Sequence, residues 1–454
     1  MEYCKFEENN KIANGQGFWG DSIDAPYNLV KYGDIDYLSL DYLAEVTLSI
    51  MQRQKLKNNQ KGYATDFVDL MKRFIVDITK KNIKVITNAG GVNPEVCREN
   101  LLKIADELNL NIKIAIIKGD DILDDIGHLL DKGVSFENMD NQSNFLEIKD
   151  NVYSANAYID SFSIAEALKT GAQIVLAGRV SDPGLVLGPA IYEFNWKKDD
   201  YDKLAAGTLA GHILECGAQC SGGNYTQWKK IPDLANIGYP IATLSDDTTF
   251  TISKDPNSGG LINKYTIIEQ ILYEMGDPKK YISPDVVVDF TSFDIKEMSD
   301  NLIEISGVKC YKDTDTYKVS INYFNGYKAS GQLTVSGPDA LEKAKLTAEI
   351  IWKRLKRAGV DFEDKLTEYL GLSSCHGLKI GEFKAQNNEI VLRLSVRDFN
   401  KEKIIRFGKE LAPVITAGPP GITGFSGGRP RPQEIIAFWP TLIDKSHIKT
   451  KVIS

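Results

Sequence analysis

The chain has 454 residues, more than a single hydrophobic core usually supports, so we expect two domains. Hydrophobic residues make up 43% and charged residues 26%, and no stretch approaches the roughly 18 consecutive apolar residues of a membrane helix, so we expect no membrane span. The formal net charge is −8 and the chain has no Lys/Arg-rich run, which argues against nucleic acid as a partner. The six cysteines are scattered, and the N-terminus is acidic, unlike a secretory signal. Both features predict a cytoplasmic protein.

Strands and helices alternate along the first part of the chain, which is typical of a parallel sheet with right-handed crossovers. In chain order we expect strands at 11–15, 35–40, 83–87, 112–120, 173–178 and 284–290, with helices at 22–32, 94–110, 163–170 and 185–192. Between the last two of these strands we expect a helix broken by small residues at 204–223, a hairpin at 238–254 and a helix at 266–276.

From about Asn301 the pattern changes to antiparallel pieces, and Asn325 with Gly326 is a typical hairpin turn. A helix at 339–358, a strand at 389–396, a helix at 403–411 and a strand at 434–439 follow. We therefore predict an α/β fold. A mainly parallel sheet flanked by helices forms the ligand-binding or catalytic domain in residues 1–295, and a second, smaller α+β domain covers 296–454.

The first predicted strand runs into the string GQGFWG, which matches the dinucleotide-binding fingerprint through Gly15, Gly17 and Gly20. Asp41 follows about twenty residues later, where that fingerprint places its ribose-binding acid. The strand before it is short, and two large aromatic rings stand where backbone should approach a pyrophosphate. We therefore favour a Gly-rich turn that shapes some other pocket.

Two further strings place polar residues directly after predicted strands. In DYLAE, Asp41 and Glu45 can orient a hydroxyl, hold a cation or accept a proton, or Asp41 only caps the next helix. In TNAGG, Asn88, Gly90 and Gly91 precede a helix, so backbone N–H groups there can hold an anion, or the turn simply requires glycine.

GRVSDPG repeats this placement, with Arg179 as a fixed cation for a carboxylate and Asp182 as a base or a helix cap. Because the carboxyl ends of parallel strands form the crevice where ligands bind, we expect these segments to converge. Gly222 and Gly223 follow a predicted helix. They allow the backbone to approach a ligand closely or, alternatively, form a tight turn. In the late Gly/Pro-rich loop, Arg429 and Arg431 close over an anion or face a partner subunit, and we favour the partner subunit.

GHILECGAQCSGG contains His212 and Glu215 three residues apart on one helix face, a candidate acid/base pair. Cys216 and Cys220 lie four apart on a neighbouring face. The string lacks paired CxxC spacing and a second cluster, so we predict no tightly bound zinc or iron–sulfur centre there. The alternative for His212 is a packed or capping histidine.

Several strings in one order resemble the acyclic terpene utilisation family over about residues 10–350: GDS, DYLAEVT, TNAGG, GAQIVLAGRVSD, AGHILECGAQCSGG, GYPIA, SGGLI, EQILYEMGDP and PDV. Members often read GRVAD where this chain has GRVSD, which leaves Arg179 and Asp182 in place. The resemblance implies a catabolic lyase that acts on a branched hydroxyacyl-CoA. It also implies that the chain works with a small companion protein, an arrangement that would fit a hydratase.

We therefore expect a lyase, and foremost a hydro-lyase, that acts on a short branched carboxylate or its CoA thioester. We expect no tightly bound cofactor, while a requirement for a divalent metal stays open. The alternatives are an NAD-linked oxidoreductase using GQGFWG and a non-catalytic ligand-binding subunit of a two-protein complex. We also expect a homo-oligomer. The candidates for proton transfer are Asp41, Glu45, Asp182, His212 and Glu215, and those for substrate binding are Asn88, Gly90, Gly91, Arg179, Gly222 and Gly223.

Overall fold

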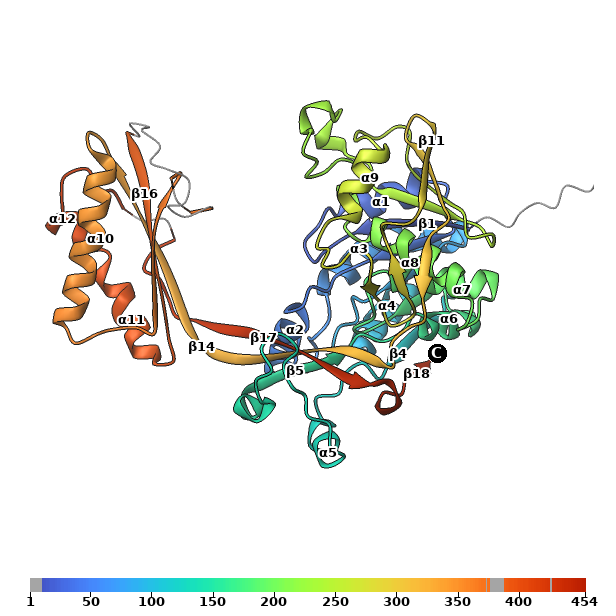
Figure 1. Ribbon diagram of the computed structural model, residues 1–454, viewed down its shortest axis with the longest axis horizontal. Coiled ribbons are helices and arrows are strands. Elements are labelled where there is room, and N and C mark those ends of the chain that lie inside the picture. Colours follow the sequence, from blue (N-terminus) through green and yellow to red (C-terminus); the bar gives the residue numbers. More distant parts are fainter. Residues whose placement is uncertain (1–9, 373, 376–387, 425–426) are drawn as a thin grey trace, which may run out of the picture. The chain divides into compact units, whose positions relative to one another are not determined.

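The computed structural model describes residues 10–372, 374–375, 388–424 and 427–454 (Figure 1). The described chain forms two compact units: unit 1 is Met1–Asn322 with Phe438–Ser454, and unit 2 is Tyr323–Ala437. Segment 1–9, on which the expectation about a secretory signal largely rests, lies outside the described residues. None of the helices in the described part of the chain combines the length and apolarity needed to cross a membrane.

The centre of unit 1 is a group of neighbouring parallel strands. In sheet order these are β1 (Asn10–Gln16), β2 (Tyr37–Leu40), β3 (Lys84–Thr87), β6 (Ile174–Leu176) and β4 (Ile114–Lys118). Each pairs in parallel with the next. The strands are almost wholly buried, and β2, β4 and β6 consist mainly of apolar residues, as expected for a sheet covered on both faces.

Antiparallel strands extend this sheet at both edges. Beyond β1 lie β7 (Pro240–Leu244), β8 (Phe250–Lys254), β12 (Leu302–Ser306) and β11 (Asp294–Ser299), and beyond β4 lies β18 (Lys451–Ile453). β7 and β8 form the hairpin that the sequence predicted at 238–254. The sheet is therefore mixed, with its parallel part in the middle.

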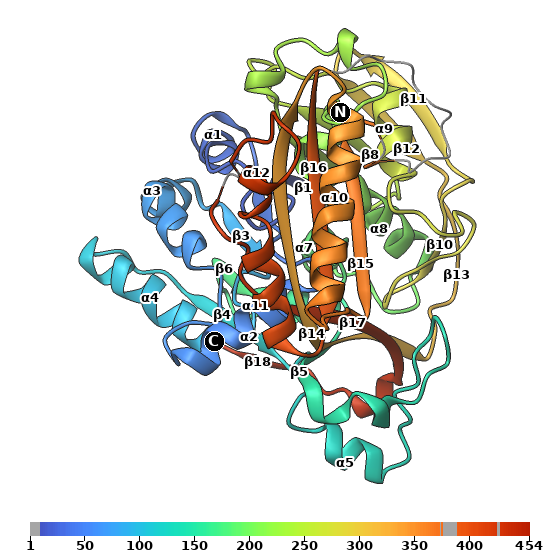
Figure 2. The ribbon, with the colours of Figure 1, turned by 90° about the vertical axis from the view of Figure 1, so that its left-hand side faces the viewer.

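Helices cover both faces of the parallel strands. One set is α1 (Asp24–Tyr32), α3 (Thr65–Lys81) and α4 (Pro94–Glu107), and the other is α6 (Phe162–Lys169), α7 (Gly184–Phe194) and α8 (Tyr201–Glu215). Within each set, neighbouring helices pack on one another and on the strands, and Figure 2 shows the first set together at one side of unit 1. In α3, Phe67, Leu70, Phe74 and Ile78 recur at helical spacing and are buried, which fixes the face that packs on the sheet.

Smaller elements complete unit 1: α2 (Thr47–Lys57), α5 (Ile126–Asp131), β5 (Val152–Ala157), α9 (Lys264–Ile271), β9 (Tyr281–Ile282), β10 (Val287–Asp289) and β13 (Lys309–Tyr311). Strands β13, β10 and β9 form a separate antiparallel sheet. The strand expected at 284–290 is thus short and belongs to this sheet rather than to the parallel one.

Unit 2 is an antiparallel sheet covered by helices. The strand order is β15 (Asp364–Leu370), β16 (Glu389–Asp398), β14 (Thr316–Ser336) and β17 (Gln433–Asp444), with helices α10 (Ala340–Arg357), α11 (Lys401–Glu410) and α12 (Val414–Ala417). Leu333 and Leu392 project from the sheet into a core with Ile351 and Phe407 from the helices. This is the α+β arrangement predicted from the sequence.

The α/β prediction is confirmed, but the units do not divide at the predicted position of 295/296. Strands β11 and β12 join the edge of the large sheet, and β18 pairs with β4, so both ends of the predicted second domain lie in unit 1. A change to antiparallel strands did not mark a domain boundary, because antiparallel strands can extend the edge of a parallel sheet.

The hairpin predicted at Asn325–Gly326 is wrong. β14 continues through this dipeptide as one long strand, and its residues 327–336 pair with β16 without interruption. The side chain of Arg397 on β16 donates a hydrogen bond of 3.0 Å to Asn325 Oδ1, and Gly326 takes a positive φ of 91° within the strand. Pairing with a distant strand here overrides a local turn signal.

Candidate active site

Polar side chains stand at or directly after the carboxyl end of each central parallel strand. In the order of the strands across the sheet they are Gln16, Asp41, Asn88, Arg179 and Asp120. All are at least 95% buried, which is unusual for residues of these types. Because parallel strands share one carboxyl edge, these polar groups lie along one edge of the sheet, where α/β proteins bind ligands.

Asp41 and Asn88 are joined by a hydrogen-bond network that fixes both side chains. Asn88 Oδ1 accepts a hydrogen bond of 2.7 Å from the backbone N–H of Tyr42, so its Nδ2 must be the donor to Asp41 Oδ1, at 2.7 Å. The backbone N–H of Leu43 donates to the same carboxylate oxygen at 2.9 Å. Burial raises the pKa of Asp41 despite the nearby charge of Arg179 and these hydrogen bonds, which favour ionisation.

Arg179 is held in place by several contacts from its own chain. Its Nη1 donates to Leu43 O at 3.0 Å, its Nε donates to Val180 O at 3.2 Å, and its Nη2 forms an ion pair with Asp182. The guanidinium lies 4.3 Å from the ring centroid of Tyr158. The Arg179 side chain is 2% exposed and that of Asp182 is 42% exposed, so the solvent-facing side of this ion pair is the Asp182 carboxylate.

Asp120 belongs to the same edge and was missed by the sequence interpretation. Its Oδ2 accepts hydrogen bonds from the backbone N–H of Arg179 at 2.7 Å and from Asn156 Nδ2 at 3.0 Å. Burial raises its pKa to about 6. Gly178 leaves room for this carboxylate, which a Cβ would strike. The signal that identified Asp41, an acid directly after a buried strand, applies equally to Asp120 at the end of 112–120.

His212 and Glu215 interact, and their contacts suggest which is the reactive group. His212 Nε2 lies 3.0 Å from the carbonyl oxygen of Ile271, and Nδ1 lies 2.9 Å from Glu215 Oε1, although not aligned for a hydrogen bond. Both neighbours are acceptors, which favours the doubly protonated ring. Burial alone would lower the pKa of His212, but Glu215 outweighs it and the pKa is raised. His212 is therefore held through Nε2 by Ile271, with its Nδ1 facing Glu215.

Glu215 joins the cluster at the carboxyl edge. The side chain of Asn14 on β1 donates to the backbone oxygen of Glu215 at 3.2 Å, and Gly17 allows β1 to approach the end of α8, since a Cβ there would lie 2.8 Å from the backbone carbon of Cys216. The charge of Glu215 contributes to the raised pKa of Asp41. Glu215 Oε2 is buried without a hydrogen-bond partner among the described residues, so it has unused acceptor capacity.

The glycines of TNAGG are accounted for by packing. Gly91 has a φ of 53° and faces Met51, and a Cβ on Gly90 would lie 2.8 Å from Pro94 Cβ. The backbone N–H of Gly91 donates to Asn88 O, and that of Ala89 donates to the side chain of Thr87. Two of the N–H groups expected to hold an anion are therefore already used within the turn.

Gly222 and Gly223 are likewise shaped by their own chain. Gly222 has a φ of 98°, and a Cβ would lie 2.6 Å from Ile231 Cδ1. The N–H of Gly223 donates to Ala218 O at 3.0 Å. The tight-turn alternative therefore accounts for both glycines.

Glu45 lies apart from the buried network. Its side chain is exposed, and its backbone oxygen accepts hydrogen bonds from Ser320 and Asn322. Its charge acts on Tyr158, the ring that contacts Arg179, and on Lys318, whose pKa is lowered by burial. Glu45 is therefore close enough to influence this site electrostatically, without being one of its buried groups.

The Gly-rich string does not have the geometry of a dinucleotide site. Gly15 lies within β1, packed against Pro26, and the following helix begins only at Asp24, four residues after Gly20. The fingerprint instead requires a helix whose N-terminus opens directly from the glycine turn. The structure therefore gives no support to the NAD-linked alternative.

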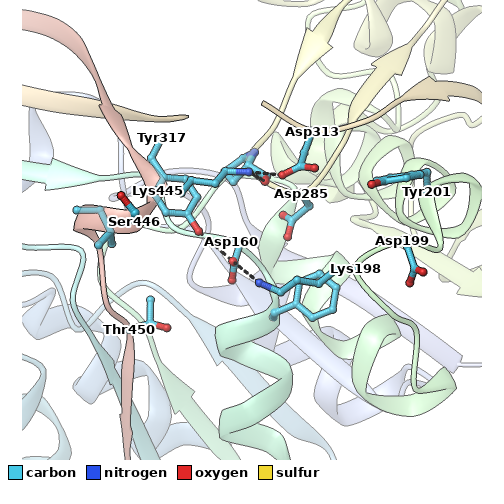
Figure 3. A pocket seen from close by; sticks show the side chains of 13 residues that line it. Asp160, Lys198, Asp199, Tyr201, Asp285, Asp313, Tyr317, Lys445, Ser446 and Thr450 are labelled. Atoms are coloured by element: carbon cyan, nitrogen blue, oxygen red, sulfur yellow. Dashed lines mark hydrogen bonds and ion pairs between the residues drawn. The ribbon is translucent and has the colours of Figure 1, made fainter. Parts of the chain in front are cut away.

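A separate polar cavity of about 520 Å³ lies elsewhere in unit 1 (Figure 3). Ser161 donates hydrogen bonds to Asp285 through its N–H, at 3.0 Å, and its hydroxyl, at 2.8 Å, while Tyr317 donates to Asp160 at 2.9 Å. Burial and the charge of Asp160 raise the pKa of Asp285 to about 7. Lys445 forms an ion pair with Asp313 on the same wall. None of the residues directly after β2 and β3 lines this cavity, and Lys198 pairs with Asp160 at its edge.

The described residues contain no group of three or more His, Cys, Asp or Glu side chains arranged to hold a metal ion. Near the predicted helix, Cys220 is fully buried and burial raises the pKa of the Cys216 thiol to about 12.

Unit 1 is thus a three-layer α/β structure with a buried carboxylate–arginine cluster at the carboxyl edge of its parallel strands, the arrangement of a small-molecule enzyme or binding protein. The chain belongs to the acyclic terpene utilisation family, whose defining pattern, that of the protein AtuA, matches residues 10–454. The resemblance seen in the sequence is confirmed and extends through unit 2. The family is named for a catabolic process. No curated protein and no solved structure matches the chain.

Proposed function

We propose that this protein is a hydro-lyase that removes or adds water on a short branched carboxylate or its CoA thioester during carbon-source catabolism. Membership of a family named for terpene utilisation supports the catabolic role. The observation that carries the choice of reaction is a buried pair of carboxylates in different environments, Asp41 and Glu215, beside the fixed guanidinium of Arg179.

Dehydration requires a base for the proton alpha to the carbonyl and an acid for the departing hydroxyl. Asp41 has a raised pKa and so retains a proton to a higher pH than an ordinary carboxyl, which suits the acid. Glu215 lies beside the imidazole of His212 and has a buried oxygen without a hydrogen-bond partner among the described residues, which suits the base. Two carboxyl groups with different environments can divide these roles.

The proposed step balances as follows. Glu215 takes the alpha proton, and the electrons of that C–H bond move toward the carboxyl or thioester oxygen as an enolate. Their return forms the carbon–carbon double bond while the C–O bond breaks and Asp41 protonates the hydroxyl, which leaves as water. Asp41 ends ionised and Glu215 protonated, and solvent restores both. Arg179, together with the amide of Asn88, stabilises the carboxylate or thioester oxygen as negative charge builds on it.

The test is hydration in the reverse direction. The purified chain is incubated in D₂O with branched unsaturated acids and their CoA thioesters, and mass spectrometry and NMR detect the hydroxylated product and deuterium at the alpha carbon. We expect turnover by the wild type and by Glu193→Gln, and none by Asp41→Asn. Glu193 is a matched control because it pairs with Lys84 at 3.0 Å, at the amino end of the same parallel strands.

If the wild type binds these compounds but never turns them over, alone or with a co-purified companion protein, the hydro-lyase proposal is wrong. Turnover that occurs only with the companion would keep the reaction and assign part of the site to a second chain. Binding without turnover would favour the alternative of a ligand-binding subunit.

A further inference from the structure

Unit 2 contains a groove of about 860 Å³ whose walls come from three elements. Ser330 on β14 and Lys409 in the last turn of α11 line one part, and segment 427–433, which leads into β17, lines the other. All of these residues belong to unit 2, and the volume is within the range of about 300–1,000 Å³ typical of small-ligand sites.

The groove is positively charged. Among the residues that the structure describes, Lys409, Arg429 and Arg431 line it and no Asp or Glu does. All three are exposed, and none forms an ion pair or hydrogen bond with any residue that the structure describes. Elsewhere in unit 2, charged side chains pair within the chain: Arg393 with Glu368, for example, and Lys403 with Asp398. Three unpaired cations in one groove are notable in a chain of net charge −8.

The backbone that carries the two arginines is rigid. Pro430 and Pro432 fix their own φ angles and restrict Arg429 and Arg431, the residues before them, to extended conformations. Gly408 on α11 and Gly331 on β14 let Pro430 lie directly against the unit, since a Cβ at Gly331 would be 2.8 Å from Pro430 Cγ and one at Gly408 would strike Pro430 O. With Pro430 packed inward, the arginines on either side of it project outward together.

We propose that this groove binds the phosphate groups of a small ligand. Arginine presents a planar fork of donors that matches phosphate oxygens, and a rigid pair of arginines loses little conformational entropy on binding. If the proposed function is correct, on which this identification of the ligand rests, the ligand is a coenzyme A species that unit 2 binds through its phosphates. The groove is compact and its cations few, which fits a small ligand better than a nucleic acid backbone.

The test is calorimetric titration of the full chain with coenzyme A, with pyrophosphate, and with pantetheine, which lacks the phosphates. We expect coenzyme A and pyrophosphate to bind with affinities that fall as salt is raised, and pantetheine to bind much more weakly. Arg429→Ala and Arg431→Ala should each weaken binding about tenfold, and Lys409→Ala somewhat less. Arg357→Ala, an exposed arginine at the end of α10 that does not line the groove, should bind as the wild type does.

Equal binding of coenzyme A by the wild type and the Arg429→Ala/Arg431→Ala double variant would overturn the proposal. So would tighter binding of an oligonucleotide than of coenzyme A, or a change of oligomeric state in the double variant by light scattering, which would assign the groove to nucleic acid or to a second copy of the chain. Pyrophosphate binding is independent of chemistry at Asp41. Its absence in a protein that hydrates substrate refutes this inference alone, whereas its presence without turnover refutes only the proposed function.

Discussion

The two candidate sites differ in the burial and pairing of their charged side chains. At the carboxyl edge of unit 1, Asp41 and Arg179 are buried and bonded to their own chain, whereas Arg429 and Arg431 in unit 2 are exposed and have no partner among the described residues. A buried charge is costly unless it is paired, so a ligand entering unit 1 must replace existing contacts group for group. An exposed cation is solvated by water, so a ligand anion can pair with it without displacing a protein contact. Dissolved salt screens this attraction.

The largest expected effect comes from separating the two carboxylates of the buried site. Glu215→Gln removes the proposed base and should abolish both turnover and exchange of the alpha proton with D₂O. Asp41→Asn removes the acid and should block turnover but leave that exchange. Losses of about 10²–10⁴-fold in kcat are expected for each, measured by product formation and deuterium incorporation. Exchange that survives Glu215→Gln would assign the base to another residue.

Arg179 tests whether a paired buried cation also binds ligand. Arg179→Ala should weaken substrate binding roughly ten- to a hundredfold, because a charge-assisted contact is worth about 1.5–3 kcal/mol. Arg179→Lys should lie between, since lysine retains the charge but not the planar fork. Calorimetry gives the affinity and thermal unfolding gives the stability of each variant.

Stability should fall as well, because Arg179 also bonds Leu43 and Asp182. Arg393→Ala is the matched control, since Arg393 pairs with Glu368 at 2.7 Å in unit 2 and should lose stability without losing substrate affinity. If Arg179→Ala behaves as this control does, with a lower Tm and unchanged affinity, its role is structural only.

Asp285 should make the protein less stable as the pH rises. Its pKa is about 7 in the folded protein, above the ordinary value of 3.8, so between these values the folded state holds a proton that the unfolded state has released. This contribution to stability is complete below pH 4 and is lost as the pH rises through 7. The Tm of Asp285→Asn relative to wild type should therefore rise between about pH 4 and pH 7.

Asp289→Asn is the contrasting control for Asp285. Hydrogen bonds from Thr291 lower the pKa of Asp289, so its ionised form stabilises the fold and the substitution should be most harmful at neutral pH. A flat Tm difference between Asp285→Asn and wild type across this range would show that Asp285 titrates normally.

The smallest expected effect is the pH dependence due to His212. Its pKa is raised in the folded protein, so its contribution to stability is fully present below its unfolded pKa of about 6.5 and is lost as the pH rises through the folded value. His212→Gln should therefore flatten the fall in Tm above about pH 6.5. It should also shift the pH profile of turnover, because Glu215 loses its cationic neighbour. An unchanged profile would remove His212 from the site.

The sequence alone predicted the succession of strands and helices, and with it the polar residues that follow β2, β3 and β6. Asp41, Asn88 and Arg179 could be found because a buried apolar run, a polar residue and a turn are all local features. The structure then brings Asp41 and Asn88 into direct contact. The same reasoning would have reached Asp120, which also ends a buried strand.

Tertiary structure decided what no local pattern contains. Asn325 and Gly326 have the composition of a turn, but β16, some seventy residues later in the chain, pairs with the strand that continues through them. The orientation of His212 depends on the carbonyl oxygen of Ile271, 59 residues away in the sequence, which no pattern around His212 predicts. Such contacts depend on which distant segments pack together, and the free energy of that packing outweighs the local preference of a few residues.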